Sequence, residues 1–217
     1  MMRKASIFIF ALGMISVMAL TGTAFAANKA GDAKAGKDKA AMCAGCHGDD
    51  GNSFVADFPR LAGQYGSYIA KQVNDFKAGH RANNDTMSGM AMTVATVQDA
   101  KDIGAYFQSQ KMAKDPLVKA NKKLIAQGEK LFKNGNPKSG VYGCVNCHGD
   151  RGKGMSKTVS QFPVIGGQHR DYLIKNLNDF KAGLRSNDPA GMMAAIAKKL
   201  SDNEIKALAA YLSSQLP

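Results

Sequence analysis

Residues 43–49 read CAGCHGD and residues 144–150 read CVNCHGD, so one motif occurs twice, 101 residues apart. Further segments repeat with it in the same order. They are FPRLAGQ at 58–64 with FPVIGGQ at 162–168, NDFKAG at 74–79 and 178–183, and Ala105-Tyr106 with Ala210-Tyr211. Duplication of one module of roughly 90 residues explains this order better than chance does. With two copies, the sequence predicts two similar domains rather than a long repeat array.

The spacing C-x-x-C-H is the attachment signature of a c-type haem. Each cysteine sulfur forms a thioether to one haem vinyl group, and the two intervening residues match the separation of those vinyls. The histidine follows directly, so its imidazole can bind the iron as an axial ligand. We therefore expect two covalently bound c-type haems. The attachment residues are Cys43 and Cys46 in the first copy and Cys144 and Cys147 in the second, with His47 and His148 as iron ligands.

Other uses of paired cysteines fit less well. Two CxxC pairs can bind zinc, but a zinc site gives no reason for a histidine after each pair, and it would tie both repeats to one ion. A thioredoxin-like motif needs a βαβ setting, and strand-like alternation is absent. Simple disulfides are the remaining alternative.

Each haem needs a sixth ligand or an open site. Methionines occur at equivalent places, in DTMSGMAM at 85–92 and DPAGMM at 188–193, about 40 to 45 residues after each histidine. A thioether is a soft ligand that favours ferrous iron. Methionines also fill gaps around an apolar macrocycle. Both roles can hold, since at most one methionine binds each iron. The spare histidines, His80 and His169, have no counterpart in the other repeat, and we interpret them as surface residues.

Helical signals occur at corresponding places in both repeats. One helix is expected before each CxxCH, near 33–42 and 122–133, and another after each Gly-Gln pair, near 65–77 and 170–181. A third closes each repeat, where Thr96-x-x-Asp99 and Ser201-x-x-Glu204 are typical capping boxes. The fold class is therefore all-α with much irregular loop.

The N-terminus has the pattern of a secretory signal peptide. Arg3 and Lys4 precede an apolar run at 5–20, and Ala24-Phe25-Ala26 is a small-x-small cleavage site. The run is shorter than the roughly 20 residues that span a bilayer. We expect a signal peptide at 1–26, cleavage after Ala26 and an exported, periplasmic protein.

At this point the sequence resembles the diheme cytochrome c4 family, two class I cytochrome c domains in tandem. The two CxxCH motifs, the F-P-x-[LI]-x-G-Q and NDFKAG segments and the methionine segments carry the resemblance, which covers essentially the whole mature chain. It implies His/Met ligation of each iron. Met193 is then the second ligand of the second haem, with Met192 as fallback. For the first haem the resemblance favours Met87, but about one extra residue before the closing helix leaves Met90 a competitor and Met92 a distant one.

The family fold also implies roles for other residues. Pro59 and Pro163 would lie beside the axial histidines and accept the imidazole Nδ1–H through their carbonyls. Gly36 and Gly128 would let the first helix of each domain cross the last closely, against Tyr106 and Tyr211. Weaker candidates for contact with the haem propionates, for which plain packing is an equal alternative, are Arg60, Gln64, Tyr68, Gln168 and Tyr172.

The expected domains are residues 27–110 and 124–217, joined by a lysine-rich, exposed linker at 111–123. Six-coordinate haems leave no place for a substrate, so the protein is expected to be an electron carrier and not an enzyme. By resemblance, a bc1-type complex or comparable quinol oxidase would donate electrons, and a terminal oxidase or another periplasmic redox protein would accept them. The alternatives are the haem subunit of a flavocytochrome c-like oxidoreductase and a diheme enzyme such as thiosulfate dehydrogenase.

Composition and charge narrow the partners. An apolar content of 45% excludes global disorder. The net charge of +12 is uneven. Region 1–26 has two basic residues and no acidic one, region 27–110 nine and nine, region 111–123 five and one, and region 124–217 thirteen and seven. We expect the linker and second domain to steer docking onto an acidic redox protein or an anionic membrane surface, in a salt-dependent way. Export argues against nucleic acid.

Overall fold

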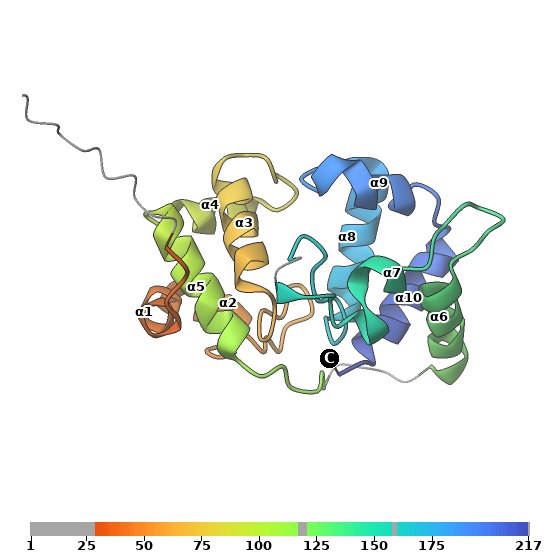
Figure 1. The fold of residues 1–217 in the computed structure, drawn as a ribbon, viewed down its shortest axis with the longest axis horizontal. Coiled ribbons are helices and arrows are strands. Elements are labelled where there is room, and N and C mark those ends of the chain that lie inside the picture. Colours follow the sequence, from red (N-terminus) through yellow and green to blue (C-terminus); the bar gives the residue numbers. More distant parts are fainter. Residues whose placement is uncertain (1–28, 117–120, 158–159, 217) are drawn as a thin grey trace, which may run out of the picture.

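The computed structural model describes residues 29–116, 121–157 and 160–216, which fold into two helical lobes side by side (Figure 1). The expected signal peptide, 1–26, and part of the expected linker, 117–120, lie outside the described residues. Within those residues the β-structure consists of a single isolated bridge between Asn136 and Val141, so the all-α expectation is confirmed. None of the described helices is long and apolar enough to cross a membrane.

The first lobe contains five helices. They are α1 (Ala33–Lys39), α2 (Ala41–His47), α3 (Gly66–Lys77), α4 (Asp85–Met92) and α5 (Val97–Ser109). The single helix expected near 33–42 is divided at Ala40, where the chain turns from α1 into α2. Helix α5 packs against both α1 and α3, and buried Ile69, Ile103 and Phe107 form the core between them.

The second lobe repeats this plan. Its elements are α6 (Lys122–Asn134), α7 (Val145–His148), η1 (Asp150–Gly152), α8 (Arg170–Ala182), η3 (Pro189–Gly191), α9 (Met192–Ala197) and α10 (Asp202–Ser213). Helix α10 packs against α6 and α8, and its core residues include Phe132, Leu208 and Tyr211. The equivalent of α2 is reduced to the short α7, because a loop at 135–144 separates it from α6.

Both closing helices begin at the expected capping boxes. Thr96 Oγ1 accepts a hydrogen bond from the Asp99 N–H at 3.0 Å, and the Asp99 carboxylate accepts one from the Thr96 N–H at 3.0 Å. Ser201 and Glu204 make the same reciprocal pair at the start of α10. Each pair satisfies backbone donors that the first helical turn leaves free. These contacts fix where the last helix of each lobe starts.

The first and last helices of each lobe cross at a glycine. A Cβ atom on Gly36 would lie 1.9 Å from the Asp102 carbonyl oxygen, and one on Gly128 would lie 2.0 Å from that of Ala207. The nearest side-chain atoms are the Cβ atoms of Tyr106 and Tyr211, as expected. Since both obstacles are backbone, neither can move aside without separating the helices.

The linker is less exposed than expected. Asp115 is buried, whereas Lys111, Ala113 and Lys114 are exposed. Asp115 is therefore an exception in the linker expected at 111–123, because the other residues of its described parts, 111–116 and 121–123, are exposed or half-buried. The physical reason is that Asp115 binds the buried His169, which charge and proline content alone do not reveal.

Candidate haem centres

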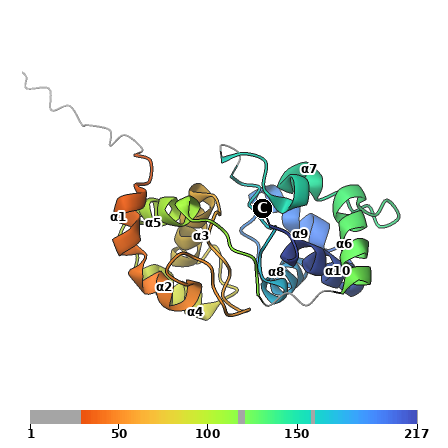
Figure 2. The same cartoon turned by 90° about the horizontal axis from the view of Figure 1, so that it is seen from below.

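The two CxxCH motifs lie on separate short helices, α2 in the first lobe and α7 in the second, on the lower and upper sides of the view in Figure 2. All four cysteines are half-buried, and none of them forms a disulfide. Before haem attachment, burial raises the pKa of the Cys43 thiol, and it raises the pKa of the Cys144 thiol to about 11. In the described part of the chain, no three His, Cys, Asp or Glu side chains gather as a metal site.

Each CxxCH histidine is fixed by a proline carbonyl from the following loop. His47 Nδ1 donates to the Pro59 oxygen at 2.7 Å, and His148 Nδ1 donates to the Pro163 oxygen at 2.9 Å. A carbonyl can only accept, so Nδ1 carries the proton and Nε2 keeps its lone pair. Burial lowers the pKa of both histidines, although the carbonyl bond opposes this. Each ring is thus a neutral, oriented imidazole, as an iron ligand must be.

The methionine segments form two short helices, α4 and α9, where the sequence signals predict no helix. In α4, Asn84 caps the helix and its Oδ1 accepts the Met87 N–H at 2.9 Å. In the second lobe, Met193 belongs to the first turn of α9. Met87, Met90 and Met193 are half-buried, whereas Met92 is 62% exposed and Met192 39% exposed. Burial therefore favours Met193 over Met192 as an iron ligand, but it does not favour Met87 over Met90.

Two glutamines hold the lobes together in a reciprocal way. Gln168 Nε2 donates to the Arg60 carbonyl at 2.9 Å, and its Oε1 accepts the Arg60 N–H at 2.8 Å. Gln64 makes the matching pair with Val164, at 2.7 and 3.1 Å. Both glutamines are buried. The sequence left two roles open for these glutamines, contact with the haem propionates and plain packing. Their side chains pack across the lobe interface.

Arginines also cross the interface in matched pairs. Arg81 and Arg185 each stack on a phenylalanine of their own lobe, Phe76 and Phe180, at 4.4 and 4.5 Å from the ring centroid. Each then donates to a tyrosine of the other lobe. Arg81 contacts Tyr172 Oη at 3.3 Å, and Arg185 contacts Tyr68 Oη at 2.9 Å. Sequence reasoning missed both arginines, although RANN and RSND do occupy matching places after NDFKAG.

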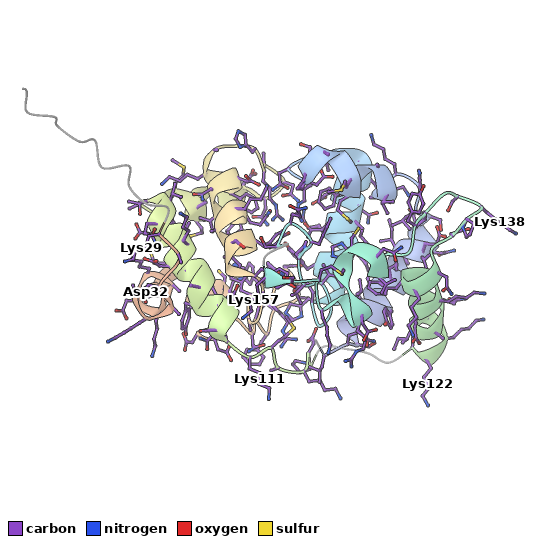
Figure 3. The ribbon with its side chains drawn as sticks, viewed as in Figure 1. Lys29, Asp32, Lys111, Lys122, Lys138 and Lys157 are labelled. Atoms are coloured by element: carbon purple, nitrogen blue, oxygen red, sulfur yellow. The ribbon has the colours of Figure 1, made fainter. Side chains whose placement is uncertain are left out.

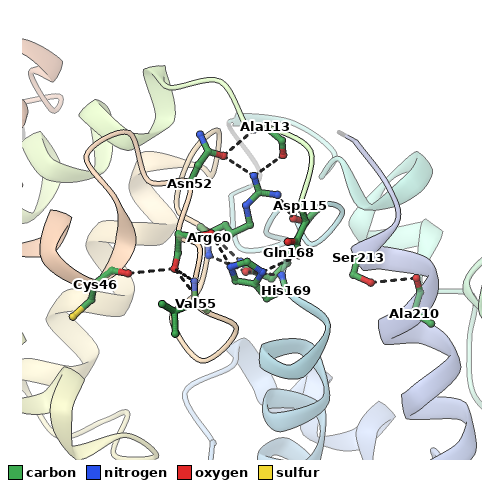
Figure 4. Close-up of polar contacts among 12 residues, drawn as sticks. Cys46, Asn52, Val55, Arg60, Ala113, Asp115, Gln168, His169, Ala210 and Ser213 are labelled. Carbon is green, nitrogen blue, oxygen red and sulfur yellow. Dashed lines mark hydrogen bonds and ion pairs between the residues drawn. The ribbon is translucent and has the colours of Figure 1, made fainter. Parts of the chain in front are cut away.

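His169 is not a surface residue, and that expectation was wrong. Its side chain and that of Asp115 are each 1% exposed (Figure 4). His169 Nδ1 lies 2.8 Å from Asp115 Oδ2, and Nε2 lies 3.0 Å from the Ser53 carbonyl oxygen. The residue is buried because it begins α8 where the two lobes and the linker meet. His80 is exposed, as expected.

Arg60 lies in the same cluster (Figure 4). Its guanidinium donates to Asn52 Oδ1 at 2.7 Å and to the Gly167 carbonyl at 2.9 Å. Its Nε is buried and has no hydrogen-bond partner in the described protein.

A cytochrome c family model matches residues 33–111 and again 125–215, one match in each lobe. Two helical lobes, each with a CxxCH motif and a fixed imidazole, thus define a two-domain c-type cytochrome. The match gives the cofactors as two covalently attached c-type haems, and the CxxCH cysteines are the matching attachment residues.

Similarity to individual proteins is extensive. Cytochrome c4 of Pseudomonas aeruginosa is 43% identical over 92% of this chain and 96% of its own length. A crystal structure of reduced cytochrome c4 from Pseudomonas stutzeri superposes with a TM-score of 0.77, at 42% identity, and covers 85% of this chain and 99% of that one. A protein of Thiomonas intermedia described as a thiosulfate dehydrogenase electron acceptor is 34% identical over 82% of this chain and 80% of its own length. The chain belongs to the diheme cytochrome c4 family, whose members are electron-transfer proteins and not enzymes.

Proposed function

We propose that the chain is a periplasmic carrier that moves electrons one at a time through two His/Met-ligated haems. The observation that supports this is that both lobes contain the same two potential iron ligands. Each lobe holds an imidazole oriented by a proline carbonyl, at 2.7 and 2.9 Å, together with a methionine-bearing helix. Two filled axial positions at each iron leave no place for a substrate.

The axial ligands in this proposal are His47 with Met87 and His148 with Met193. Half-burial of both methionines supports them, and the exposure of Met192 counts against that fallback. Met90 stays the competitor for the first iron, because it is half-buried one helical turn after Met87. The haem, when bound, supplies a reversible Fe(III)/Fe(II) couple. The protein residues orient the ligands and exclude water.

The backbone carbonyls of Pro59 and Pro163 act on the iron-binding histidines on the side of the ring away from Nε2. Their carbonyls hold each imidazole by its Nδ1–H, which raises the electron donation of Nε2 and fixes the plane of the ring. Arg60 is proposed to meet a propionate of the first haem through its buried, unpaired Nε. Its other donors are engaged with Asn52, Ala113 and Gly167, so the side chain has little freedom to turn away.

The physiological setting is proposed from the N-terminus and the relatives. A signal peptide at 1–26 with cleavage after Ala26 would deliver the chain to the periplasm, where a bc1-type quinol-oxidising complex would donate and a terminal oxidase would accept. Similarity to a thiosulfate dehydrogenase electron acceptor supports a second kind of donor, a periplasmic sulfur-oxidising enzyme. The expected domain limits, 27–110 and 124–217, stay a proposal.

A reductive titration of the purified holoprotein tests this function. A carrier takes up two electrons per chain in one-electron steps and returns both to an added oxidant such as ferricyanide. It also purifies as a lone chain. Co-purification with a flavin subunit would favour the oxidoreductase-subunit alternative, and turnover of thiosulfate would favour a diheme enzyme.

A further inference from the structure

The loops that follow the two CxxCH motifs carry opposite charge. Residues 48–57 (GDDGNSFVAD) contain three aspartates and no cation, whereas residues 149–157 (GDRGKGMSK) contain one aspartate and three cations. The two loops are structurally equivalent. The Gly51 N–H donates to the Gly48 carbonyl at 3.0 Å, and the Gly152 N–H donates to that of Gly149 at 3.1 Å. The same backbone frame thus presents an acidic surface on one lobe and a basic one on the other.

The basic loop is held directly against the haem-attachment helix α7. The Gly154 N–H donates to the His148 carbonyl at 2.7 Å. Arg151, Lys153 and Lys157 point into solvent, and Met155 is an exposed apolar side chain among them (Figure 3 labels Lys157). A cationic rim around an exposed apolar residue is the usual composition of a docking site for an acidic protein.

A second exposed loop flanks α7 on its other side. Six residues separate Gly36 from Cys43 in the first lobe, but fifteen separate Gly128 from Cys144 in the second, so the second lobe has a nine-residue insertion. The insertion is well anchored. Asn136 and Val141 exchange backbone hydrogen bonds of 2.8 and 3.0 Å, and Lys199 Nζ donates to the Gly140 carbonyl at 3.1 Å.

This anchored loop exposes one large aromatic side chain. Val141 is buried in the core, whereas the next residue, Tyr142, is 75% exposed. Tyr142 shares a surface hollow of about 430 Å³ with Lys133 and with Asn146, which lies between the two haem-attaching cysteines. Tyrosines presented on a rigid frame are favoured anchors of protein interfaces, because little side-chain entropy is lost on binding.

We propose that the surface around α7, defined by Tyr142, Met155, Lys133, Arg151, Lys153 and Lys157, is the docking site for the acidic redox partner. The proposal rests on the carrier function proposed above. The equivalent surface around α2 repels such a partner through Asp49, Asp50 and Asp57. Helix α2 belongs to the first lobe and α7 to the second, and the two lie on opposite sides of the view in Figure 2. An acidic partner therefore exchanges electrons with the second haem.

The test compares charge reversals that are equal in total charge but differ in place. The loop variant is Lys153→Glu with Lys157→Glu. The matched control is Lys34→Glu with Lys37→Glu, on exposed positions of α1. The probe is plastocyanin, a small blue-copper protein with an acidic patch, and the readout is the second-order electron-transfer rate in stopped flow as ionic strength rises. We expect the loop variant to slow the reaction about tenfold at low salt and to flatten its salt dependence, and the control to change the rate less than threefold.

Tyr142→Ala tests the anchor separately, with Phe54→Ala in the loop of the first lobe as its control. We expect a roughly tenfold lower rate for Tyr142→Ala and an unchanged rate for Phe54→Ala. Equal effects of the two charge variants would overturn the proposal, since total charge would then govern docking. Retained plastocyanin rates together with loss of binding to phosphatidylglycerol vesicles would assign the surface to a membrane instead. Failure of the wild type to reduce ferricyanide would count against the carrier function itself.

Discussion

The side-chain amide of Gln168 pairs with the backbone of Arg60 across the lobe interface, donating to its carbonyl at 2.9 Å and accepting its N–H at 2.8 Å. Gln64 repeats the arrangement in the opposite direction on Val164. The backbone N–H and carbonyl of Arg60, and those of Val164, thus have hydrogen-bond partners although they are buried. These two amide side chains, together with the arginine–tyrosine contacts, therefore hold the two lobes in a fixed relative placement.

Replacement of Gln168 by alanine should weaken the interface. It leaves the buried Arg60 N–H and carbonyl unpaired, which costs about 1–3 kcal/mol. Urea unfolding of the holoprotein measures the loss. Gln64→Ala should lose a similar amount, and Gln127→Ala, at an exposed position of α6, should lose almost nothing. Equal stability of Gln168→Ala and Gln127→Ala would show that the interface does not need this pair.

The crossing of α6 and α10 predicts a strong effect of one methyl group. Gly128→Ala places a Cβ atom 2.0 Å from the Ala207 carbonyl oxygen, so the helices must separate. We expect a loss of at least about 1–3 kcal/mol, as in other overpacked cores. Gly89→Ala in α4 is the control, because a Cβ atom there meets nothing within 4 Å. Thermal unfolding should show no loss for Gly89→Ala, and a tolerated Gly128→Ala would contradict the close crossing.

Asp102 predicts acid sensitivity of the first lobe. Hydrogen bonds from Lys39, the Asp32 N–H and Gln98 lower the pKa of the Asp102 carboxyl to about 2. The unfolded chain has the ordinary value near 4. A lowered pKa in the folded state stabilises the protein above pH about 4, and this contribution is lost as the pH falls toward 2. Unfolding followed by circular dichroism between pH 6 and pH 2 should therefore show a smaller acid loss for Asp102→Asn.

The matched control for this pH dependence is Asp57→Asn, at an exposed position of the same lobe. The Asp57→Asn variant should lose stability between pH 6 and pH 2 to the same extent as the wild type. An acid limb that is the same for Asp102→Asn and the wild type would show that the carboxylate is not linked to folding.

Single methionine substitutions should identify the sixth ligands. Met193→Ala should remove the far-red methionine-to-iron band of one haem, because no other half-buried methionine lies in α9. Met87→Ala should remove that of the other, whereas Met90→Ala should keep it. Loss of the band in Met90→Ala with retention in Met87→Ala would reverse the assignment. Met92→Ala, at an exposed position, serves as the control.

Much of each lobe could be predicted from the sequence, because the signals are local. The start of each closing helix is marked by a capping box only four residues long, which begins at Thr96 and at Ser201. The glycine crossings and the proline carbonyls needed family resemblance, since no spacing shows that Pro59 reaches His47. The short helices α4 and α9 were missed because they have only eight and six residues. Segments of this length are too short to show the apolar periodicity of a helix, although methionine and alanine favour one.

The interface could not be predicted in this way. His169 and Asp115 are ordinary surface residue types, and their burial depends on a contact between segments 54 positions apart. Arg60 and Gln168 pair over 108 positions. Hydrophobic periodicity reports which face of one element is buried, and it carries no information on polar residues that meet across two lobes. The repeat itself was the available signal, since RANN and RSND occupy matching places.

The absorption spectrum of the ferric holoprotein tests the central claim most directly. Two His/Met-ligated haems predict a far-red methionine-to-iron band whose intensity accounts for both irons, with no high-spin component. A high-spin signal on either haem would mean an open or water-bound iron. It would contradict the electron-carrier account and favour a diheme enzyme.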